Sequence, residues 1–368
     1  TVNVVMEVES TQIEEVMVVA YGTAKKSSFT GSAHQISAEK INARPITNIS
    51  KAIEGTSAGV QVNSGTGQPG SGLDIRIRGF GSINASNDPL YIVDGVPYSG
   101  SISNLNNNDI ESMSLLKDAG STALYGNKAS NGVVVITTKK GSKDNNLIQF
   151  KMSKGVISRS LPEYERVNAK EYYPLMWEAY RNSLFYVTTP PTIDVANTTA
   201  TNGIVARLGY NPFNVANDLV VGTDGILNAD AKLLYPNDLN WFNPLLRTGL
   251  RSDYSLLFSG GSQKSDYLFS LGYLDETGYQ INSDYNRITA RLNVNTQPRP
   301  WLKSGLNLSA TITESNQSAA DGGTSYVNPF RTSRNMGPIY PVYAHDPVTG
   351  EYLYDFAGNK IFDLGNMT

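Results

Sequence analysis

The chain has 368 residues, enough for two or three domains, and its formal net charge of -3 gives no reason to propose nucleic acid as a partner. It has no cysteine, which excludes disulfides and thiolate metal sites. Charged residues make up 17% of the chain and there are 21 tyrosines, a combination that suits a protein at a membrane interface but also a tyrosine-rich secreted β-protein.

The N-terminal segment has the pattern of a strand. Residues 1–9 alternate between apolar and polar side chains, which predicts a half-buried strand. No signal peptide opens the chain, and we expect this strand to be the tail of a domain that begins upstream. No apolar run approaches roughly 18 residues, so any crossing of a membrane is expected to use strands rather than helices.

Residues 36–140 are expected to form a compact α/β unit that contains short helices. Asn48 is a suitable N-cap for a helix over the residues that follow it, and Gly55 can end that helix. Further along the chain, Asn108 or Asp109 can cap another turn of helix.

The strands of this unit are predicted from short segments. Residues 73–78 alternate in polarity, residues 90–93 are apolar, and residues 132–140 are strongly β-branched. Asp94-Gly95 follows the second of these segments and is a common dipeptide in two-residue hairpin turns.

The texture of the sequence changes at residue 147. Five segments alternate between apolar and polar side chains, and each is about 9–13 residues long, close to what a tilted strand needs to cross a bilayer. They are residues 147–157, 251–259, 266–274, 287–295 and 302–314. We therefore expect five antiparallel strands.

The connections between these segments differ in length. Residues 260–265 and 296–300 are short, residues 275–285 are intermediate, and residues 158–250 and 315–368 are very long. Transmembrane barrels show this asymmetry, with tight periplasmic turns and long external loops. The intermediate connection is then expected on the external side.

Aromatic residues stand near the ends of the five segments. Trp301, beside a short connection, and Tyr279 and Tyr285, at the other end, are placed for the aromatic girdles of a barrel. A soluble antiparallel sandwich also alternates in polarity, so the strands alone leave the choice between a membrane barrel and a sandwich open.

A series of sequence blocks decides between these alternatives. The blocks are residues 59–81 (GVQVNSGTGQPGSGLDIRIRGFG), 89–98 (PLYIVDGVPY), 108–112 (NDIES), 116–118 (LKD) and 123–140 (ALYGNKASNGVVVITTKK). In this order and spacing they resemble the plug of the SusC-type TonB-dependent outer-membrane transporters, the SusC/RagA-like family. The resemblance covers residues 1–157 closely and the remainder by pattern.

The resemblance implies an α+β plug domain inside a transmembrane antiparallel β-barrel. The family barrel has 22 strands, of which about the first five would be present here. We expect residues 1–9 to be the last strand of an upstream β-sandwich domain and residues 10–35 to be the TonB box and its linker. The plug domain is expected at residues 36–146, and the first strands and external loops of the barrel at residues 147–368.

The segment that resembles a TonB box consists of Glu14, Glu15, Val16, Met17, Val18, Val19, Ala20 and Tyr21. TonB would bind such a segment by strand addition, which requires an extended, β-prone chain on a flexible tether. The valines favour extension, and residues 23–32 supply polar slack. The alternative is a plain edge strand of the preceding domain.

Residues 65–70 formally fit the GxGxxG pattern of dinucleotide sites. A proline interrupts the pattern and an alternating strand follows it where a helix is needed, so we reject a dinucleotide site. In that strand Arg76 and Arg78 share one face. The resemblance implies that they contact carboxylates of the barrel wall, and the alternative is that they are ordinary surface arginines.

Polar loops of the plug are candidates for contact with the substrate, because their side chains both donate and accept hydrogen bonds. The candidates are Asn84, Ser86, Asn87, Asp88, Tyr98, Asn104, Asn106 and Asn107. For any one of them, the alternative is a polar residue that only completes a loop.

Catalysis has little support in this sequence. The two histidines, His34 and His345, lie in expected loops without a recognisable nucleophile motif, and a histidine-based triad or a zinc site is not expected. We therefore expect no enzyme activity, no catalytic or metal-binding residue and no cofactor.

The resemblance implies active import of a large nutrient across the outer membrane of a Gram-negative bacterium, as in the SusC proteins of the Bacteroidetes. The barrel would lie in outer-membrane lipid. TonB and its inner-membrane energising complex would supply the energy, and a SusD-like lipoprotein would hold the ligand as a lid. An oligosaccharide is the first expectation for the ligand and an oligopeptide is the second.

Two other functions stay open at this point. The chain could serve a surface receptor or adhesin that binds without transport, or a TonB-linked signal transducer. The residues expected to face the lumen, Asp253, Arg287, Arg291 and Lys303, are mixed in sign and do not choose a substrate.

Overall fold

The computed structural model describes residues 16–19, 22–25, 33–44, 46–63, 67–84, 86–118, 122–142, 146–317, 328–346 and 349–363. The expected strand at residues 1–9 lies outside them. The chain divides into two compact units. Unit 1 comprises Thr1–Ser158 and Thr248–Gln317, and unit 2 comprises Arg159–Arg247 and Ser318–Thr368.

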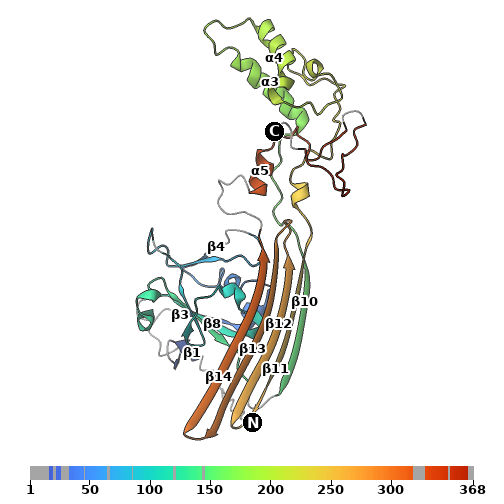
Figure 1. Ribbon diagram of the computed structural model, residues 1–368. Coiled ribbons are helices and arrows are strands. Elements are labelled where there is room, and N and C mark those ends of the chain that lie inside the picture. The colour runs from blue at the N-terminus through green and yellow to red at the C-terminus, as the bar shows by residue number, and fades with distance from the viewer. Residues whose placement is uncertain are drawn as a thin grey trace, which may run out of the picture. The chain divides into compact units, whose positions relative to one another are not determined.

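The N-terminal part of unit 1 is built on a five-stranded mixed sheet (Figure 1). Its strands, in spatial order, are β3 (Ala33–Ser37), β8 (Ile110–Leu116), β9 (Val133–Thr138), β6 (Leu90–Val93) and β7 (Val96–Pro97). β6 and β9 run parallel, and the other neighbours run antiparallel. β8, β9 and β6 are therefore interior strands, and β3 and β7 are the edges.

Smaller elements complete this plug-like part. Two further sheets have two strands each: β1 (Val16–Val19) with β2 (Gly22–Lys25), and β4 (Val60–Asn63) with β5 (Asp74–Ile77). The helices are α1 (Ala38–Asn42) and the 3-10 turns η2 (Ile49–Ala52), η3 (Ile102–Asn104), η4 (Asn107–Asp109), η5 (Ala123–Tyr125) and η6 (Asn127–Ala129).

Two local predictions are confirmed by the backbone and its hydrogen bonds. The Asn48 side chain accepts from the Ser50 amide at 2.9 Å and so caps η2, while Gly55 follows at a φ of 70°. Asp94 and Gly95 have φ values of 48° and 85°, which is the pattern of a type I′ turn between β6 and β7.

The expected helix after Asn108 or Asp109 is wrong. A single 3-10 turn ends at Asp109, it is capped by Asn106, and the chain then continues as β8. β8 has Met113 and Leu115 fully buried on one side and Leu116 on the other. A central strand that is covered on both faces loses its alternation of polarity, which is why the sequence pattern did not reveal it.

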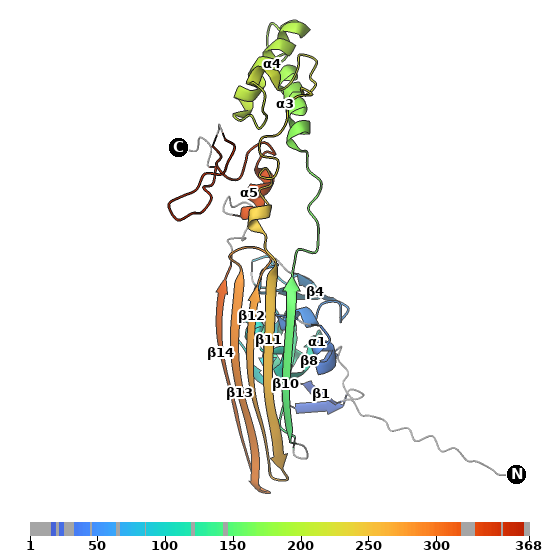
Figure 2. The ribbon, with the colours of Figure 1, turned by 90° about the vertical axis from the view of Figure 1, so that its right-hand side faces the viewer.

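The five alternating segments form five strands, as predicted. They are β10 (Leu147–Ile157), β11 (Gly249–Ser262), β12 (Ser265–Thr277), β13 (Asp284–Arg299) and β14 (Leu302–Asn316). They pair antiparallel in chain order in one sheet, which we call the wall sheet. The plug-like part lies against one face of it (Figure 2).

The two faces of the wall sheet differ in chemistry. On β13, Arg287 and Arg291 are buried with exposed fractions of 3% and 6%, whereas Ile288 between them is 50% exposed. The outer face carries exposed apolar side chains, among them Ile148, Phe150, Leu271, Tyr273, Ile288 and Ile312. Polar side chains inside and apolar side chains outside are the arrangement of a barrel wall in lipid.

Unit 2 forms part of what the sequence predicted as two long loops, and it contains helices. They are α3 (Ala169–Ser183), α4 (Ile193–Leu208), α5 (Pro329–Asn335) and the 3-10 turns η7 (Asn217–Leu219) and η8 (Asn243–Leu245). Tyr173, Trp177 and Ile204 belong to its buried core. Among the described helices, none has the length and apolar character that crossing a membrane requires.

Replacing Gly132 with alanine is expected to destabilise unit 1 by roughly 1–3 kcal/mol. Gly132 has a φ of 92°, and a Cβ atom there would lie 2.8 Å from Ile77 Cδ1. Thermal unfolding of the purified protein in detergent measures the effect. Gly72→Ala is the matched control, because a Cβ at Gly72 meets no atom within 4 Å. Equal melting temperatures for the two variants would contradict the prediction.

Candidate functional site

The contact between the plug-like part and the wall sheet is built around arginines of the wall. Arg251 on β11 and Arg287 and Arg291 on β13 all point from the inner face and are at least nine-tenths buried. Removing a guanidinium from water is costly unless its donors find acceptors. The partners of these three side chains therefore decide how the two parts are held together.

Arg287 is bound mainly by backbone carbonyl groups. Its Nη1 donates to Ser103 O at 2.6 Å and to Leu105 O at 2.9 Å, on either side of the end of η3. Tyr285 on the same strand donates its hydroxyl to Ser103 O at 3.3 Å. The wall thus recognises a loop of the plug by its main chain.

Arg251 belongs to a denser network. It donates to Thr47 Oγ1 at 2.9 Å and to Ile46 O at 3.2 Å in the plug. Within the wall it pairs with Asp253 at 2.8 Å and with Glu276 at 3.4 Å. Thr47 in turn donates its hydroxyl to the Glu276 carboxylate. Residues 46 and 47 are therefore held against the wall by hydrogen bonds to a charged cluster.

Arg291 makes an ion pair that joins plug and wall, with Asp94 at 2.5 Å. Asp94 Oδ2 also accepts from Thr138 Oγ1 at 2.7 Å and from Asn307 Nδ2 at 3.0 Å. Because Asp94 sits in the tight turn after β6, the short β6–β7 hairpin presents this carboxylate to the wall. The hairpin is thus a docking point for β13 and β14.

Two aspartates of the plug, the half-buried Asp94 and the buried Asp109, have opposite pKa shifts. Burial opposes ionisation of Asp94, but the hydrogen bonds from Thr138 and the charge of Arg291 outweigh it and lower the pKa of Asp94 below its ordinary 3.8. Burial raises the pKa of Asp109, despite nearby Arg291 and Lys139. The ionised form of Asp94 is therefore stabilised by the fold, whereas that of Asp109 is not.

Two of the wall arginines have a buried donor that is left unsatisfied by the part of the chain that the structure describes. Among the described residues, Arg251 Nε and Arg291 Nε are buried without a hydrogen-bond partner in the protein. Such contacts are weaker than a fully satisfied network, so they permit release.

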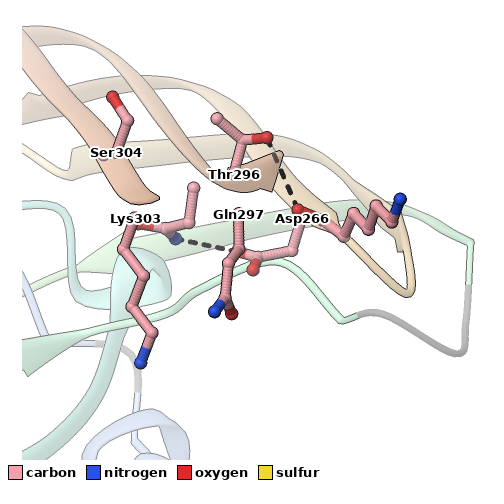
Figure 3. A pocket seen from close by; sticks show the side chains of 8 residues that line it. Asp266, Thr296, Gln297, Lys303 and Ser304 are labelled. Atoms are coloured by element: carbon pink, nitrogen blue, oxygen red, sulfur yellow. Dashed lines mark hydrogen bonds between the residues drawn. The ribbon is translucent and has the colours of Figure 1, made fainter. Parts of the chain in front are cut away.

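A separate polar pocket of 340 Å³ lies at the end of the wall sheet that carries the short turns. Figure 3 shows Asp266, Thr296, Gln297, Lys303 and Ser304 around it. Asn295 donates to Asp266 at 2.8 Å across β12 and β13. The mixture of one carboxylate, two lysines and amides carries no specific chemistry by itself.

Comparison with known proteins accounts for this arrangement. Residues 25–133 match the family described as the TonB-dependent Receptor Plug Domain. The chain is 31% identical to the TonB-dependent receptor SusC of Bacteroides thetaiotaomicron over 382 residues, covering 100% of this chain and 32% of that protein. A structure of the RagAB peptide importer matches with a TM-score of 0.62 at 32% identity, covering 82% of this chain and 33% of that chain.

The chain belongs to the SusC-type TonB-dependent receptors. It is also 31% identical to the TonB-dependent receptor P3 of Formosa agariphila over 364 residues, covering 98% of this chain and 31% of that protein. The chain spans about a third of the length of the curated relatives it matches. As in its family, this receptor is an outer-membrane protein, and its wall sheet is part of a β-barrel around a plug.

Only part of the TonB box predicted for this receptor lies within the described residues. Val16–Val19 forms β1 and pairs with β2, in the register Val16 to Lys25. Glu14, Glu15, Ala20 and Tyr21 lie outside the described residues. The segment is extended, as strand addition requires, and its role as a TonB box stays a prediction.

The two arginines predicted to contact the wall lie in different surroundings. Arg76 pairs with Asp88 at 3.7 Å and its guanidinium lies 5.3 Å from the centre of the Phe80 ring. Arg78 is exposed at a φ of 59°. Their contact with wall carboxylates stays a prediction, because the described strands are five of a larger barrel.

The predicted substrate-contacting residues of this receptor fall into three groups by burial. Asn84, Ser86 and Asp88 are exposed. The buried group supports loops and the interface: Asn87 accepts from Gly81 N and Ser82 N at 2.7 and 2.9 Å, Asn106 donates to Thr289 at 3.3 Å, and Asn107 donates to Ile46 O at 2.6 Å. Tyr98 and Asn104 are half-buried. Substrate contact stays a prediction for all eight.

Two expectations about single side chains are corrected. Tyr285 is 3% exposed and packs on Gly70 of the plug, so it faces inward and not into a lipid girdle. It has the same parity on β13 as Arg287, and the alternation rule would have placed it there. His34 lies in strand β3 and not in a loop.

The sequence pattern predicted part of what the wall arginines do. Parity placed Arg287 and Arg291 on the lumen side, but their plug partners were not foreseen. Carbonyl acceptors such as Ser103 O leave no side-chain signature in a sequence. Only the charge of Asp94 could have suggested its pairing with an arginine.

Asp94→Asn is expected to destabilise this receptor at neutral pH by about 3 kcal/mol, because it leaves the Arg291 guanidinium buried without its carboxylate. The contribution of Asp94 is present above pH 3.8, its ordinary pKa, and is lost as the pH falls through the lower pKa of the folded state. Thermal unfolding of wild type and variant in detergent between about pH 3 and pH 8 should therefore converge at the acid end.

Asp109→Asn is the matched control for this experiment. Its folded-state pKa is raised, so ionisation above pH 3.8 costs stability and removing the charge relieves that cost. We expect Asp109→Asn to melt at or above the wild-type temperature at neutral pH. Equal losses in the two variants would contradict the roles assigned to the two carboxylates.

Proposed function

We propose that this chain is part of a receptor that imports a large nutrient through the outer membrane in a TonB-dependent way. The observation that supports it is a plug with its own sheet and hydrophobic core, held against a barrel wall by polar contacts, with an extended N-terminal segment ahead of it. A plug sealed by apolar packing would not release, whereas buried arginines on carbonyl oxygens can exchange those acceptors for water.

We assign the energising partner to TonB and the docking segment to residues 14–21. A SusD-like lipoprotein is the proposed lid on the external side. The ligand expected from the sequence is an oligosaccharide. An oligopeptide is the second candidate, supported by the 32% identity to a receptor chain of the RagAB peptide importer and by the pocket of unit 2 described below. The molecule is proposed as a transporter without catalytic activity.

A single proline in the TonB box tests the energy coupling. Val18→Pro removes a backbone donor from β1 and is expected to abolish uptake while ligand binding at the cell surface survives. Val18→Thr keeps a β-branched residue and the donor, so it should transport normally. Uptake and surface binding of labelled ligand are measured side by side in cells. Continued uptake by the proline variant would reject TonB coupling through this segment and favour another mode of function.

A disulfide between plug and wall tests whether the plug has to move. The chain has no cysteine, and a Cβ atom at Gly272 on β12 would lie 3.4 Å from Asn106 Cγ. This is close to the geometry of a disulfide, so Asn106→Cys with Gly272→Cys is expected to cross-link. Uptake should stop in the oxidised receptor and return on reduction.

The control for this cross-link shares one of its cysteines. Gly272 and Thr289 are register partners on β12 and β13, so Gly272→Cys with Thr289→Cys ties the wall to itself and leaves the plug free. Uptake should then be insensitive to oxidation. Transport by the plug–wall cross-linked receptor, with the cross-link verified by mass spectrometry, would contradict plug movement as the gating step.

A further inference from the structure

Unit 2 contains a pocket of 430 Å³ that takes no part in the plug–wall contact. Its lining is mainly apolar and includes Val167, Leu233, Leu239, Phe242, Leu246 and Pro338. Pockets of a few hundred cubic ångströms that combine apolar walls with a few placed polar groups are typical ligand sites. The polar part of the lining consists of Arg159, Glu163, Tyr164, Arg166, Asn168, Asn240 and Asn243.

Three guanidinium groups lie near the ring of Phe242: Arg159 and Arg166 line the pocket, and Arg334 lies at its edge in contact with the lining residue Glu163. The Cζ atoms of Arg159, Arg166 and Arg334 lie 5.8, 5.9 and 6.0 Å from the centre of the Phe242 ring. Phe242 itself is 5% exposed, so its ring forms a fixed floor under the charges. Cations over an aromatic face are held there by its quadrupole.

Glu163 is the carboxylate that pairs with this cluster in the described part of the chain. It contacts Arg159 at 2.5 Å and Arg334 at 3.3 Å. The hydrogen bond from Arg159 lowers the pKa of Glu163, so it is ionised at neutral pH. Three positive charges thus face one negative charge, and the pocket keeps an excess of positive charge.

Arg166 differs from the other two in its role. It donates to Ser333 O, Arg334 O and Met336 O at 3.1, 2.8 and 3.2 Å, at the C-terminal end of α5. Its donors are engaged by the fold, and it positions α5 beside the pocket. Arg159 and Arg334 share a single carboxylate and retain donors for a second one.

We propose that this pocket binds the C-terminal end of an oligopeptide, with the terminal carboxylate on Arg159 and Arg334 and an apolar last side chain on the Phe242 wall. The proposal rests on the proposed import function and names its substrate class. A sugar ring carries hydroxyl groups on all sides that need partners, whereas more than half of the residues that line this pocket are apolar. An acidic peptide end with an apolar side chain satisfies both halves of the site.

The test uses the full-length receptor purified in detergent and the peptide Ala-Ala-Ala-Leu-Phe as free acid and as C-terminal amide. Binding of both is measured by isothermal titration calorimetry. We expect the acid to bind about tenfold or more tightly than the amide, because the neutral amide cannot form the charge-assisted hydrogen bonds that a carboxylate makes with the two arginines. Equal affinity for acid and amide, or no binding of either, would overturn the proposal without the need for any variant.

Variants that should change the affinity for the acid in opposite directions make this test stricter. Arg159→Gln and Arg334→Gln should each weaken binding of the acid about tenfold and leave that of the amide unchanged. Glu163→Gln should strengthen binding of the acid, because it removes the carboxylate that competes for the same arginines. If Glu163 only held the two arginines in place, Glu163→Gln would not raise the affinity for the acid. That result would overturn the proposed competition and, with it, the proposed site.

The matched control is Arg207→Gln. The Arg207 guanidinium lies 4.6 Å from the centre of the Tyr180 ring in the same unit but does not line the pocket, so affinity for the acid should be unchanged. A trigalacturonate probe separates the rival class of ligand: binding of this acidic glycan with the same arginine dependence, without binding of the peptide, overturns the peptide assignment.

These measurements need no TonB, so they are separable from uptake. If the receptor distinguishes acid from amide but imports nothing, the proposed ligand site stands and the proposed import function is rejected. If the receptor imports nutrient without distinguishing the two peptides, the proposed import function stands and the proposed ligand site is rejected.

Discussion

Arginines are buried on the inner face of the wall sheet, and their need for hydrogen-bond acceptors constrains the rest of unit 1. Desolvating a guanidinium costs several kcal/mol unless nearly all of its donors find acceptors. Arg287 finds them in the main chain at Ser103 and Leu105, and Arg291 finds one in the Asp94 carboxylate. The loops of the plug are thus positioned by the needs of the wall as well as by their own sheet.

The contacts that position the plug against the wall are separate from those that keep the plug folded. Its hydrophobic core, around Ile36, Met113 and Ile136, lies inside the domain and is not shared with the wall. Contacts with the wall are polar, and water can replace each of them at modest net cost. Movement against the wall therefore leaves the main apolar burial of the plug intact.

The sequence was most informative where chemistry repeats along the chain. Alternation predicted the five wall strands and placed Arg287 on the inner face, and local turn chemistry predicted the cap at Asn48 and the hairpin at Asp94. It failed for β8, whose burial on both faces hides any period, and for α3 and α4 inside an expected loop. Partners such as Ser103 O were invisible because every residue carries the same carbonyl group.

The position of β3 at the edge of its sheet has a mechanical consequence. β8 is its one ladder neighbour in the described sheet, so peeling β3 away breaks a single ladder and leaves four strands assembled. Peeling also exposes Ile36, which is fully buried in the core of the plug, and the core residue Ile41 follows in α1. Beyond these residues the backbone meets Ile46 and Thr47, which are hydrogen-bonded to Arg251 on the second wall strand. A tug from the N-terminal side would therefore work first against the apolar core of the plug and only then against its contacts with the wall.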